Sequence, residues 1–163
     1  MKALLLPSIK SVDMIYKEKK YSKYLFCTNS SSVKIYCEFK LNISCLDINK
    51  YFSTARRAFF YNKLLSKYLK DLRNFDQSLS KLLNNKEKIY VSNWIFHLYR
   101  YTPFFYYYSL FNFKNSLKNF LKKKKIKELI VVKDFKSNHF LFSNDDLVKI
   151  IYSLKFKNIK FLE

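Results

Sequence analysis

Positively charged side chains are the residues of this sequence whose type and number could do chemistry. The 163-residue chain carries 32 Lys and Arg against 12 Asp and Glu, which gives a formal net charge of +20. Because carboxylates are so few, most of the cations need negative charge from outside the chain. Phosphate is the anion that such clusters bind, so nucleic acid is the first candidate partner and an anionic membrane surface the second.

Many of these cations recur at helical spacing. In the segment from Tyr51 to Arg73, apolar residues fall on one side of a helical wheel and cations on the other. In the segment from Leu110 to Lys123, lysines recur every four residues beside an apolar face. An ordinary solvated helix face is the alternative interpretation of both patterns. The cations predicted to contact phosphate are Arg56, Arg57, Lys63, Lys67, Lys70, Arg73, Arg100, Lys114, Lys118, Lys122, Lys123, Lys124 and Lys125.

Residues that could catalyse a reaction form no recognisable motif. The chain has no glycine, so it contains neither a P-loop nor a glycine-rich dinucleotide fingerprint. Asp134 and the pair Asp145 and Asp146 could meet where parallel strands end, but a strand-end turn and a helix cap explain them more simply. The histidines His97 and His139 have no acid placed to form a triad. We therefore expect no enzymatic activity, and we assign no catalytic residue.

The cysteines Cys27, Cys37 and Cys45 have neither the spacing of a zinc site nor the even number of a disulfide framework. We expect them to pack as small apolar residues in a reducing compartment, with no metal and no cofactor. The aromatic stretch Trp94–Phe113 contains His97 and Arg100 and is not a clean membrane span, so the protein is expected not to span a membrane.

The second half of the sequence predicts the elements that would position the cations. The β-branched run Leu129–Val132 is typical of a buried parallel strand. An amphipathic helix over Asn144–Phe156, with a Ser143–Asp146 capping box, and a strand over Ile159–Leu162 follow it. The predicted fold class is therefore α/β, with a small parallel sheet and a βαβ unit flanked by basic helices. The two strands are expected to be parallel neighbours.

The first half is organised less clearly. Residues 1–32 are interpreted as an N-terminal extension, and residues 33–163 as a single α/β domain. The alternation in VKIYCEFKL predicts a strand over residues 33–41. Asp47 or Asn49 is expected to cap a long helix that ends near Arg73. Residues 74–108 are interpreted as a divergent, irregular aromatic extension, with a short helix or a loop near Gln77–Leu83.

The absence of glycine needs an explanation, since glycine normally occupies positive-φ positions. We expect Asn to take its place at Asn84, Asn85 and Asn158. Lys, Asn, Tyr, Phe and Ile have AT-rich codons, whereas Gly, Ala, Pro and Arg have GC-rich ones. An AT-rich genome, such as that of an organelle, explains this composition without selection on the fold, and it also accounts for part of the lysine excess.

The run SLKNFLKKKKIKELIVVKDF resembles a stretch of the large-subunit ribosomal protein L-four family, in which a basic helix, a lysine-rich turn and a strand follow one another. Upstream, EFKLNISCLDINKYFSTARRAFFYNKLL is similar to the early strand and first helix of that family. The resemblance covers residues 33–163. The family carries a long Gly- and Arg-rich extension towards the peptide exit tunnel, and residues 74–108 would replace it with a segment that has no glycine and one arginine, Arg100.

The resemblance implies a structural protein of the large ribosomal subunit that binds and stabilises ribosomal RNA and contacts neighbouring ribosomal proteins, with no small-molecule substrate. A shortened, divergent member encoded by an AT-rich genome would belong to a mitochondrial ribosome, with a plastid-type organelle or an AT-rich bacterial cytoplasm as alternatives. The competing interpretation is a lineage-specific accessory subunit of a mitochondrial respiratory or other membrane complex, in which the aromatic residues contact protein and lipid.

Overall fold

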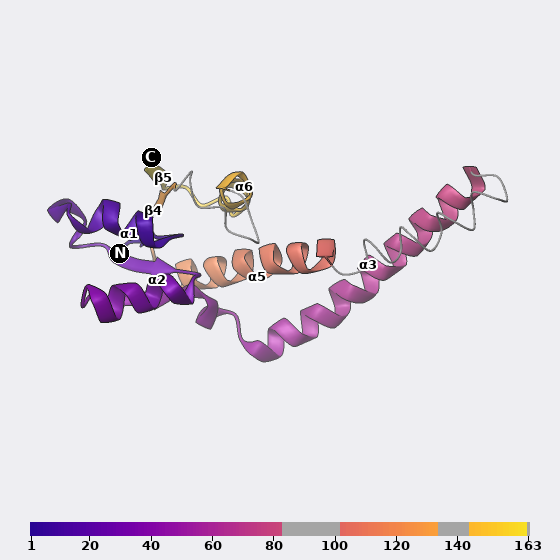
Figure 1. Ribbon diagram of the computed structural model, residues 1–163, viewed down its shortest axis with the longest axis horizontal. Coiled ribbons are helices and arrows are strands. Elements are labelled where there is room, and N and C mark those ends of the chain that lie inside the picture. Colours follow the sequence, from indigo (N-terminus) through magenta and orange to yellow (C-terminus); the bar gives the residue numbers. More distant parts are fainter. Residues whose placement is uncertain (83–101, 134–143, 163) are drawn as a thin grey trace. The chain divides into compact units, whose positions relative to one another are not determined.

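The computed structural model describes residues 1–82, 102–133 and 144–162 (Figure 1). The chain divides into two compact units. One unit combines Met1–Phe52 with Asn112–Glu163, and the other is formed by Ser53–Phe111. We refer to them as the α/β unit and the helical unit.

The α/β unit is built on a five-stranded sheet in which every strand pair is parallel. The strand order is β3-β2-β1-β4-β5, so that β1 lies in the middle. The α/β fold class predicted from the sequence is confirmed. The strands are β1 (Lys2–Leu5), β2 (Leu25–Thr28), β3 (Cys45–Asp47), β4 (Glu128–Val132) and β5 (Ile159–Leu162).

Alternate residues of the two central strands contribute to two separate apolar cores. Leu5 of β1 and Val131 of β4 face one core, together with Phe120 of helix α5 and Ile151 of helix α6. Leu4 of β1 faces the other core. This alternation follows from the pleat of a strand, and it explains why both β1 and β4 read as continuous apolar runs: the sheet is covered on both faces.

Short helices cover one face of the sheet and longer ones the other. Residues of α1 and α2 belong to the core with Leu4, whereas those of α5 and α6 belong to the core with Leu5. Serines begin the two short helices: Ser8 forms a capping box with Ser11, and the Ser30 side chain accepts a hydrogen bond from the Val33 amide. The helices are α1 (Ile9–Tyr16), α2 (Ser31–Ile35), α3 (Thr54–Leu82), α5 (Thr102–Lys123) and α6 (Asn144–Ser153).

The βαβ unit predicted in the second half is confirmed. Strands β4 and β5 are parallel neighbours, with Leu129 opposite Ile159 and Val132 opposite Leu162. Helix α6 connects them, and Ile151 on this helix is completely buried. The helix ends at Ser153, three residues before the predicted end. Residues Asp134, His139 and Ser143, for which a strand-end turn, a loop and a capping box were expected, lie outside the described residues.

The interpretation of residues 1–32 as an extension is wrong. This segment contains β1, α1 and β2, and β1 pairs with both β2 and β4 at the centre of the sheet. The run Ala3–Leu6 is fully buried because the sheet is covered on both faces. The first 32 residues therefore form part of the core of the α/β unit.

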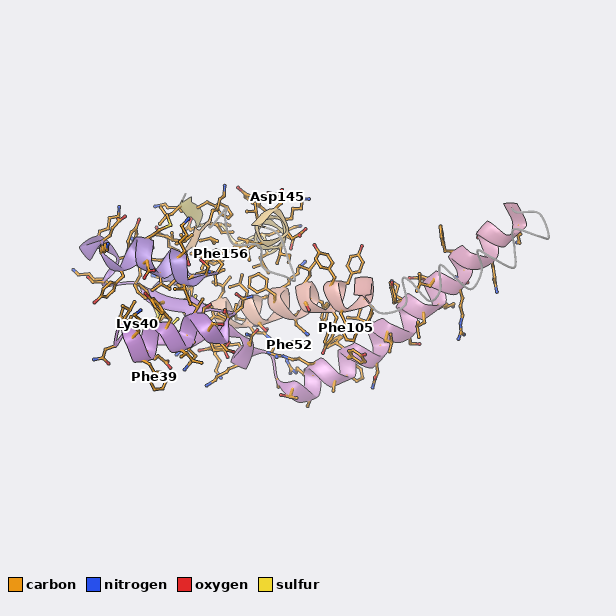
Figure 2. The ribbon with its side chains drawn as sticks, viewed as in Figure 1. Phe39, Lys40, Phe52, Phe105, Asp145 and Phe156 are labelled. Carbon is orange, nitrogen blue, oxygen red and sulfur yellow. The ribbon has the colours of Figure 1, made fainter. Side chains whose placement is uncertain are left out.

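The strand predicted over residues 33–41 is also wrong. Helix α2 is followed directly by the π-helix η2 (Tyr36–Lys40). Val33 and Cys37 are buried at helical i, i+4 spacing, whereas Ile35 and Phe39, which share their face in an alternating pattern, are 55% and 84% exposed. Figure 2 shows Phe39 projecting from this helix. The same apolar residues fit both periods, and the burial pattern shows that the helical one applies, with Ser30 at the N-cap.

The helical unit contains α3 and the first half of α5. The predicted long helix is present but begins at Thr54 rather than after Asp47, because the Asp47 carboxylate caps the short helix η3 (Ile48–Tyr51), accepting a hydrogen bond of 2.8 Å from the Asn49 amide. Helix α3 continues to Leu82 and absorbs the short helix expected near Gln77. The described ends of the predicted irregular extension, residues 74–82 and 102–108, are helical; Trp94, His97 and Arg100 lie outside the described residues.

Positive φ angles occur without glycine. Among the described residues they belong to Asn42, Lys125 and Lys155, with φ values of 53°, 50° and 51°. Lys125 follows the end of α5, and the Ile126 amide donates a hydrogen bond of 3.0 Å to the Leu121 carbonyl, as in a helix C-cap that usually contains glycine. The expectation that Asn158 takes this conformation is wrong, and Asn84 and Asn85 lie outside the described residues.

Candidate nucleic-acid interface

A line of cations follows the exposed side of α3. At about 100° per residue, five cations lie within about 40° of a single line along the helix. We call them the α3 stripe: Arg56, Lys63, Lys67, Lys70 and Lys81, all exposed. At about 1.5 Å per residue, the stripe extends over about 37 Å. Four of its members were predicted from the sequence, and Lys81, which continues the same spacing, was missed.

Aromatic packing decides which side of α3 faces outward. Tyr61 of α3 lies edge-on to Phe104 and Tyr108 of α5, with ring centroids 5.2 and 5.0 Å apart. The Tyr68 ring lies 5.6 Å from Phe104, and the Tyr108 hydroxyl donates a hydrogen bond of 3.0 Å to the Arg57 carbonyl. These contacts occupy the apolar face of α3. The opposite face, which carries the α3 stripe, is left to solvent.

No ion pair neutralises the α3 stripe within the part of the chain that the structure describes. Asp71 is exposed and stands at i, i+4 from Lys67, but no ion pair joins the two in the described structure. In a protein with balanced charge, such a helix usually carries i, i+4 pairs of opposite sign. Among the residues that the structure describes, the stripe is therefore a surface of unneutralised positive charge.

An exposed aromatic ring interrupts the α3 stripe. Phe59 is 65% exposed and lies three residues after Arg56 and four before Lys63, so both cations are its neighbours on the helix surface. An exposed ring between cations can stack on an unpaired base while the cations bind the flanking phosphates. The sequence-based reasoning did not single out Phe59, although its position between Arg56 and Lys63 was visible in the sequence.

The other predicted cations are placed differently. Arg57 is half-buried on the side of α3 that faces α5, and Arg73 is exposed about 100° away from the line of the stripe. On α5, which is partly in each unit, Lys118 and Lys122 are exposed and Lys114 is half-buried. Only four of the predicted cations therefore fall on a common line of α3.

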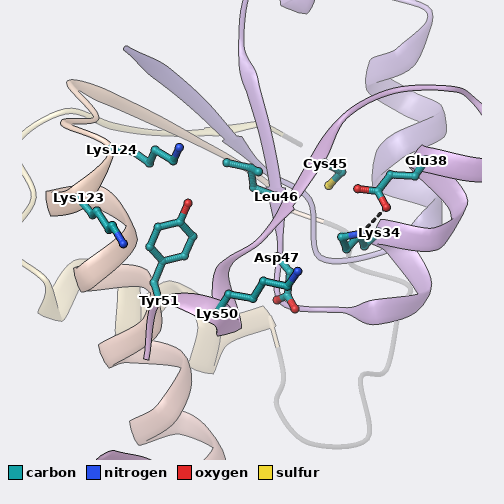
Figure 3. Close-up of a pocket in the computed structure, with 9 residues that line it drawn as sticks. All are labelled: Lys34, Glu38, Cys45, Leu46, Asp47, Lys50, Tyr51, Lys123 and Lys124. Atoms are coloured by element: carbon teal, nitrogen blue, oxygen red, sulfur yellow. Dashed lines mark hydrogen bonds and ion pairs between the residues drawn. The ribbon is translucent and has the colours of Figure 1, made fainter. Parts of the chain in front are cut away.

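A second basic cluster lies in the α/β unit, where it lines a pocket of about 550 Å³. Figure 3 shows Lys123 and Lys124, from the end of α5, on one side of the pocket and Lys34 of α2 on the other. Lys50 and Tyr51 of η3 also line the pocket. Lys123 and Lys124 were predicted as phosphate contacts, whereas Lys34 and Lys50 were not.

The three cysteines are buried thiols with no disulfide. Burial raises the pKa of the Cys27 thiol above its ordinary value. A hydrogen bond with Cys37, together with burial, also raises the pKa of the Cys45 thiol above its ordinary value. Cys27 and Cys45 are therefore neutral at physiological pH, and neither is a ready nucleophile.

Other kinds of site have little support in the described residues. In residues 1–82, 102–133 and 144–162, no group of three or more His, Cys, Asp or Glu side chains could hold a metal ion. Asp145 and Asp146 lie in the first turn of α6, where carboxylates complement the helix dipole. None of the helices in the described part is both long and apolar enough to cross a bilayer.

Comparisons with known proteins provide no family for this chain. No protein-family model matches the sequence, and neither a curated protein nor a solved structure is significantly similar to it.

Proposed function

We propose that this protein binds RNA as a structural component of a ribonucleoprotein particle. The observation that carries the proposal is the α3 stripe, five exposed cations along one helix with no ion pair in the described part of the chain. A line of cations without ion pairs in the described residues suits a phosphate backbone, which presents negative charge at regular intervals. The exposed ring of Phe59 within the stripe adds a stacking surface.

The packing of α3 favours RNA over a lipid surface. A helix that binds in the plane of a membrane buries its apolar face among the lipids and keeps its cations at the headgroups. The apolar face of α3 is already occupied by Phe104 and Tyr108 of α5. The exposed side carries the cations, and a single exposed ring of the described residues, Phe59, lies beside them. This side can hold phosphates, whereas one ring is less apolar surface than a membrane-inserting helix face presents.

The resemblance to the ribosomal L-four family suggests the particle. On this proposal the partners are large-subunit ribosomal RNA and neighbouring ribosomal proteins, and the particle is a mitochondrial ribosome. Residues 74–108, which belong to the helical unit, would then occupy the place of the extension of that family. An AT-rich bacterial or plastid-type ribosome is the alternative location.

The salt dependence of RNA binding tests the role of the α3 stripe. Each phosphate contact contributes about 0.7–0.9 to the slope of log K against log salt concentration. Substituting Lys63, Lys67 and Lys70 together with Gln should therefore lower the slope by about 2–3. Gln has nearly the helix propensity of Lys, so α3 should remain folded.

The matched control removes three exposed lysines from the α/β unit. Lys10, Lys17 and Lys23 are exposed and have no ion pair in the described residues, and their substitution with Gln changes the net charge equally. The control should keep the wild-type slope. Equal loss of slope in both variants would mean that binding depends on net charge alone, which would contradict an interface at the α3 stripe.

A further inference from the structure

The pocket of about 550 Å³ in the α/β unit lies beside β3, the edge strand of the sheet. Three segments that are distant in the sequence meet there: the helix α2 with its π-helical continuation, the turn from β3 into η3, and the end of α5. Figure 3 shows their charged side chains around the same space. The volume falls within the range of small-molecule sites, about 300–1,000 Å³.

The charges that line this pocket do not cancel. Glu38 is paired with Lys34, four residues earlier on the helix. The Asp47 carboxylate caps η3 by accepting the Asn49 amide hydrogen bond and keeps its negative charge, so four lysines and two carboxylates leave the lining with a net charge of +2. Within the described part of the chain, no carboxylate pairs with the remaining lysines, Lys50, Lys123 and Lys124.

The wall that carries these three lysines is held in place by packing. The Asn119 side-chain amide of α5 donates a hydrogen bond of 3.0 Å to the Tyr51 carbonyl. The Tyr51 ring lies edge-on to Phe120, at 5.2 Å between centroids, and Phe120 is completely buried. The Lys124 amide donates to the Phe120 carbonyl at 2.9 Å, which continues the last turn of α5. These contacts fix the backbone positions from which the three lysines project before any ligand binds.

The types of residue in the pocket indicate the kind of anion. The cations are all lysines, which act as point charges, and no arginine is present to hold a planar carboxylate with two parallel hydrogen bonds. Three unpaired ammonium groups suit an anion with more than one negative charge. A terminal phosphate carries about 1.5–2 negative charges at neutral pH and several acceptor oxygens.

We propose that this pocket binds a terminal phosphate or diphosphate group, held by Lys50, Lys123 and Lys124. The same chemistry is supplied by a free nucleotide and by the 5′-phosphorylated end of an RNA. The Tyr51 ring, with the Lys123 ammonium 5.9 Å from its centre, marks the boundary of the pocket towards α5. The inference is independent of the α3 stripe, which belongs to the other unit.

Binding of inorganic pyrophosphate and of ADP, measured by calorimetry at about 150 mM salt to screen loosely held ions, tests the pocket directly. The wild-type protein should bind at least one of them saturably with a stoichiometry of one. Substituting Lys123 and Lys124 together with Gln should weaken binding at least tenfold, because each lost charge-assisted hydrogen bond removes a substantial contribution. A Lys50→Gln variant should weaken it as well.

The control variant substitutes Lys118 and Lys122 with Gln. Both lie on the same helix, are exposed and do not line the pocket, so the change in charge is matched. This control should bind pyrophosphate and ADP like the wild type, and so should the variant that lacks Lys63, Lys67 and Lys70. An equal loss of binding in the Lys118 and Lys122 variant would overturn the proposal. The proposal would also be overturned if the wild type bound neither pyrophosphate nor ADP saturably and bound 5′-phosphorylated and 5′-hydroxyl RNA with equal affinity.

Two short RNAs of identical sequence, one with a 5′-phosphate and one with a 5′-hydroxyl, distinguish the two sources. Tighter binding of the phosphorylated RNA, lost in the Lys123 and Lys124 variant, would assign the pocket to an RNA end. Equal binding of both RNAs, combined with saturable ADP binding, would assign it to a free nucleotide. Either result supports a phosphate site, and neither depends on whether the α3 stripe binds RNA.

Discussion

The α/β unit and the helical unit differ in how they bury apolar side chains. The α/β unit buries aliphatic side chains on both faces of a sheet, and Leu4, Leu5, Leu129 and Val131 are almost inaccessible to solvent. In the helical unit, Phe104 is the one apolar side chain of the described residues that is fully buried, at 2% exposure. Around Phe104, the rings of Tyr61, Tyr68 and Tyr108 are half-buried, and Phe105 is exposed. The α/β unit therefore has an apolar core on each face of its sheet. The helical unit has only the aromatic packing between α3 and α5, which we call the seam.

The two units also differ in whether their cations form ion pairs. In the α/β unit, Glu128 of β4 bridges Lys2 of β1 and Lys160 of β5, at 2.9 and 3.0 Å. The α3 stripe of the helical unit has no such pairing in the described residues. A unit with a thin core and unpaired cations gains more from a polyanionic partner than a unit that already pairs part of its charge. If the proposed RNA binding is correct, the helical unit is therefore the part that RNA would stabilise more.

The largest expected effect comes from placing a charge in the core of the α/β unit. Ile151 of α6 is completely buried, so Ile151→Asp should lower the free energy of unfolding by about 3–5 kcal/mol, as for other buried unpaired charges. Urea unfolding followed by circular dichroism measures the change. The matched control is Ile35→Asp at a site 55% exposed, where a change within about 0.5 kcal/mol is expected. Similar losses in both variants would argue against the buried position of α6.

A smaller and more local effect is expected in the helical unit. Phe104→Ala removes the ring that contacts Tyr61, Tyr68 and Tyr108, and it should destabilise the seam by about 3 kcal/mol, the lower end for such truncations. Hydrogen exchange should accelerate in α3 while the amides of β1 and β4 stay protected.

Phe105, the next residue of α5, provides the control for that experiment. It is 48% exposed, and Figure 2 shows its position on the helix. Phe105→Ala should leave exchange in α3 nearly unchanged. If Phe104→Ala instead exposed β1 and β4 together with α3, the two units would unfold as one, and the distinction between them would be lost.

The smallest expected effect concerns the ion pairs across the sheet. Hydrogen bonds from Lys2 and Lys160 lower the pKa of Glu128 in the folded protein. A lowered folded-state pKa means stabilisation that is present above the unfolded-state pKa and is lost as pH falls through the folded-state value. Glu128→Gln should therefore lower Tm slightly at pH 7, and the difference from wild type should shrink once pH falls below the unfolded-state pKa of about 4.3 and vanish below the lowered folded-state pKa. A Tm difference that grew on acidification would show that the carboxylate is not stabilised by these lysines.

The second half of the fold could be predicted from the sequence because its signals are local. Leu129–Val132 is a β-branched run, and the next helix and strand are separated by clear changes in hydrophobic period. The run Ala3–Leu6 is apolar but has no β-branched residue, and four such residues fit several structures. Residues 33–41 fit two periods at once, and only the buried Val33 and Cys37 show that the helical one applies.

The two candidate sites also differ in whether the sequence could predict them. The α3 stripe could be predicted because its residues lie on one helix, where spacing alone places them together. The pocket could not, since Lys34, Lys50 and Lys124 come from three segments that only the sheet order brings together. No pattern in the sequence links residue 34 to residue 124. The acids that partner some of these cations, such as Glu38 for Lys34, likewise become known only from the structure.

Sedimentation of the tagged protein from cells tests the central claim, a structural place in the large ribosomal subunit, most directly. The protein should migrate with large ribosomal subunits through a gradient at moderate salt and should dissociate as the salt concentration rises, because phosphate contacts weaken steeply with salt. The variant without Lys63, Lys67 and Lys70 should dissociate at lower salt than the variant without Lys10, Lys17 and Lys23. Migration with a detergent-solubilised membrane complex, and none with ribosomal subunits, would contradict the account.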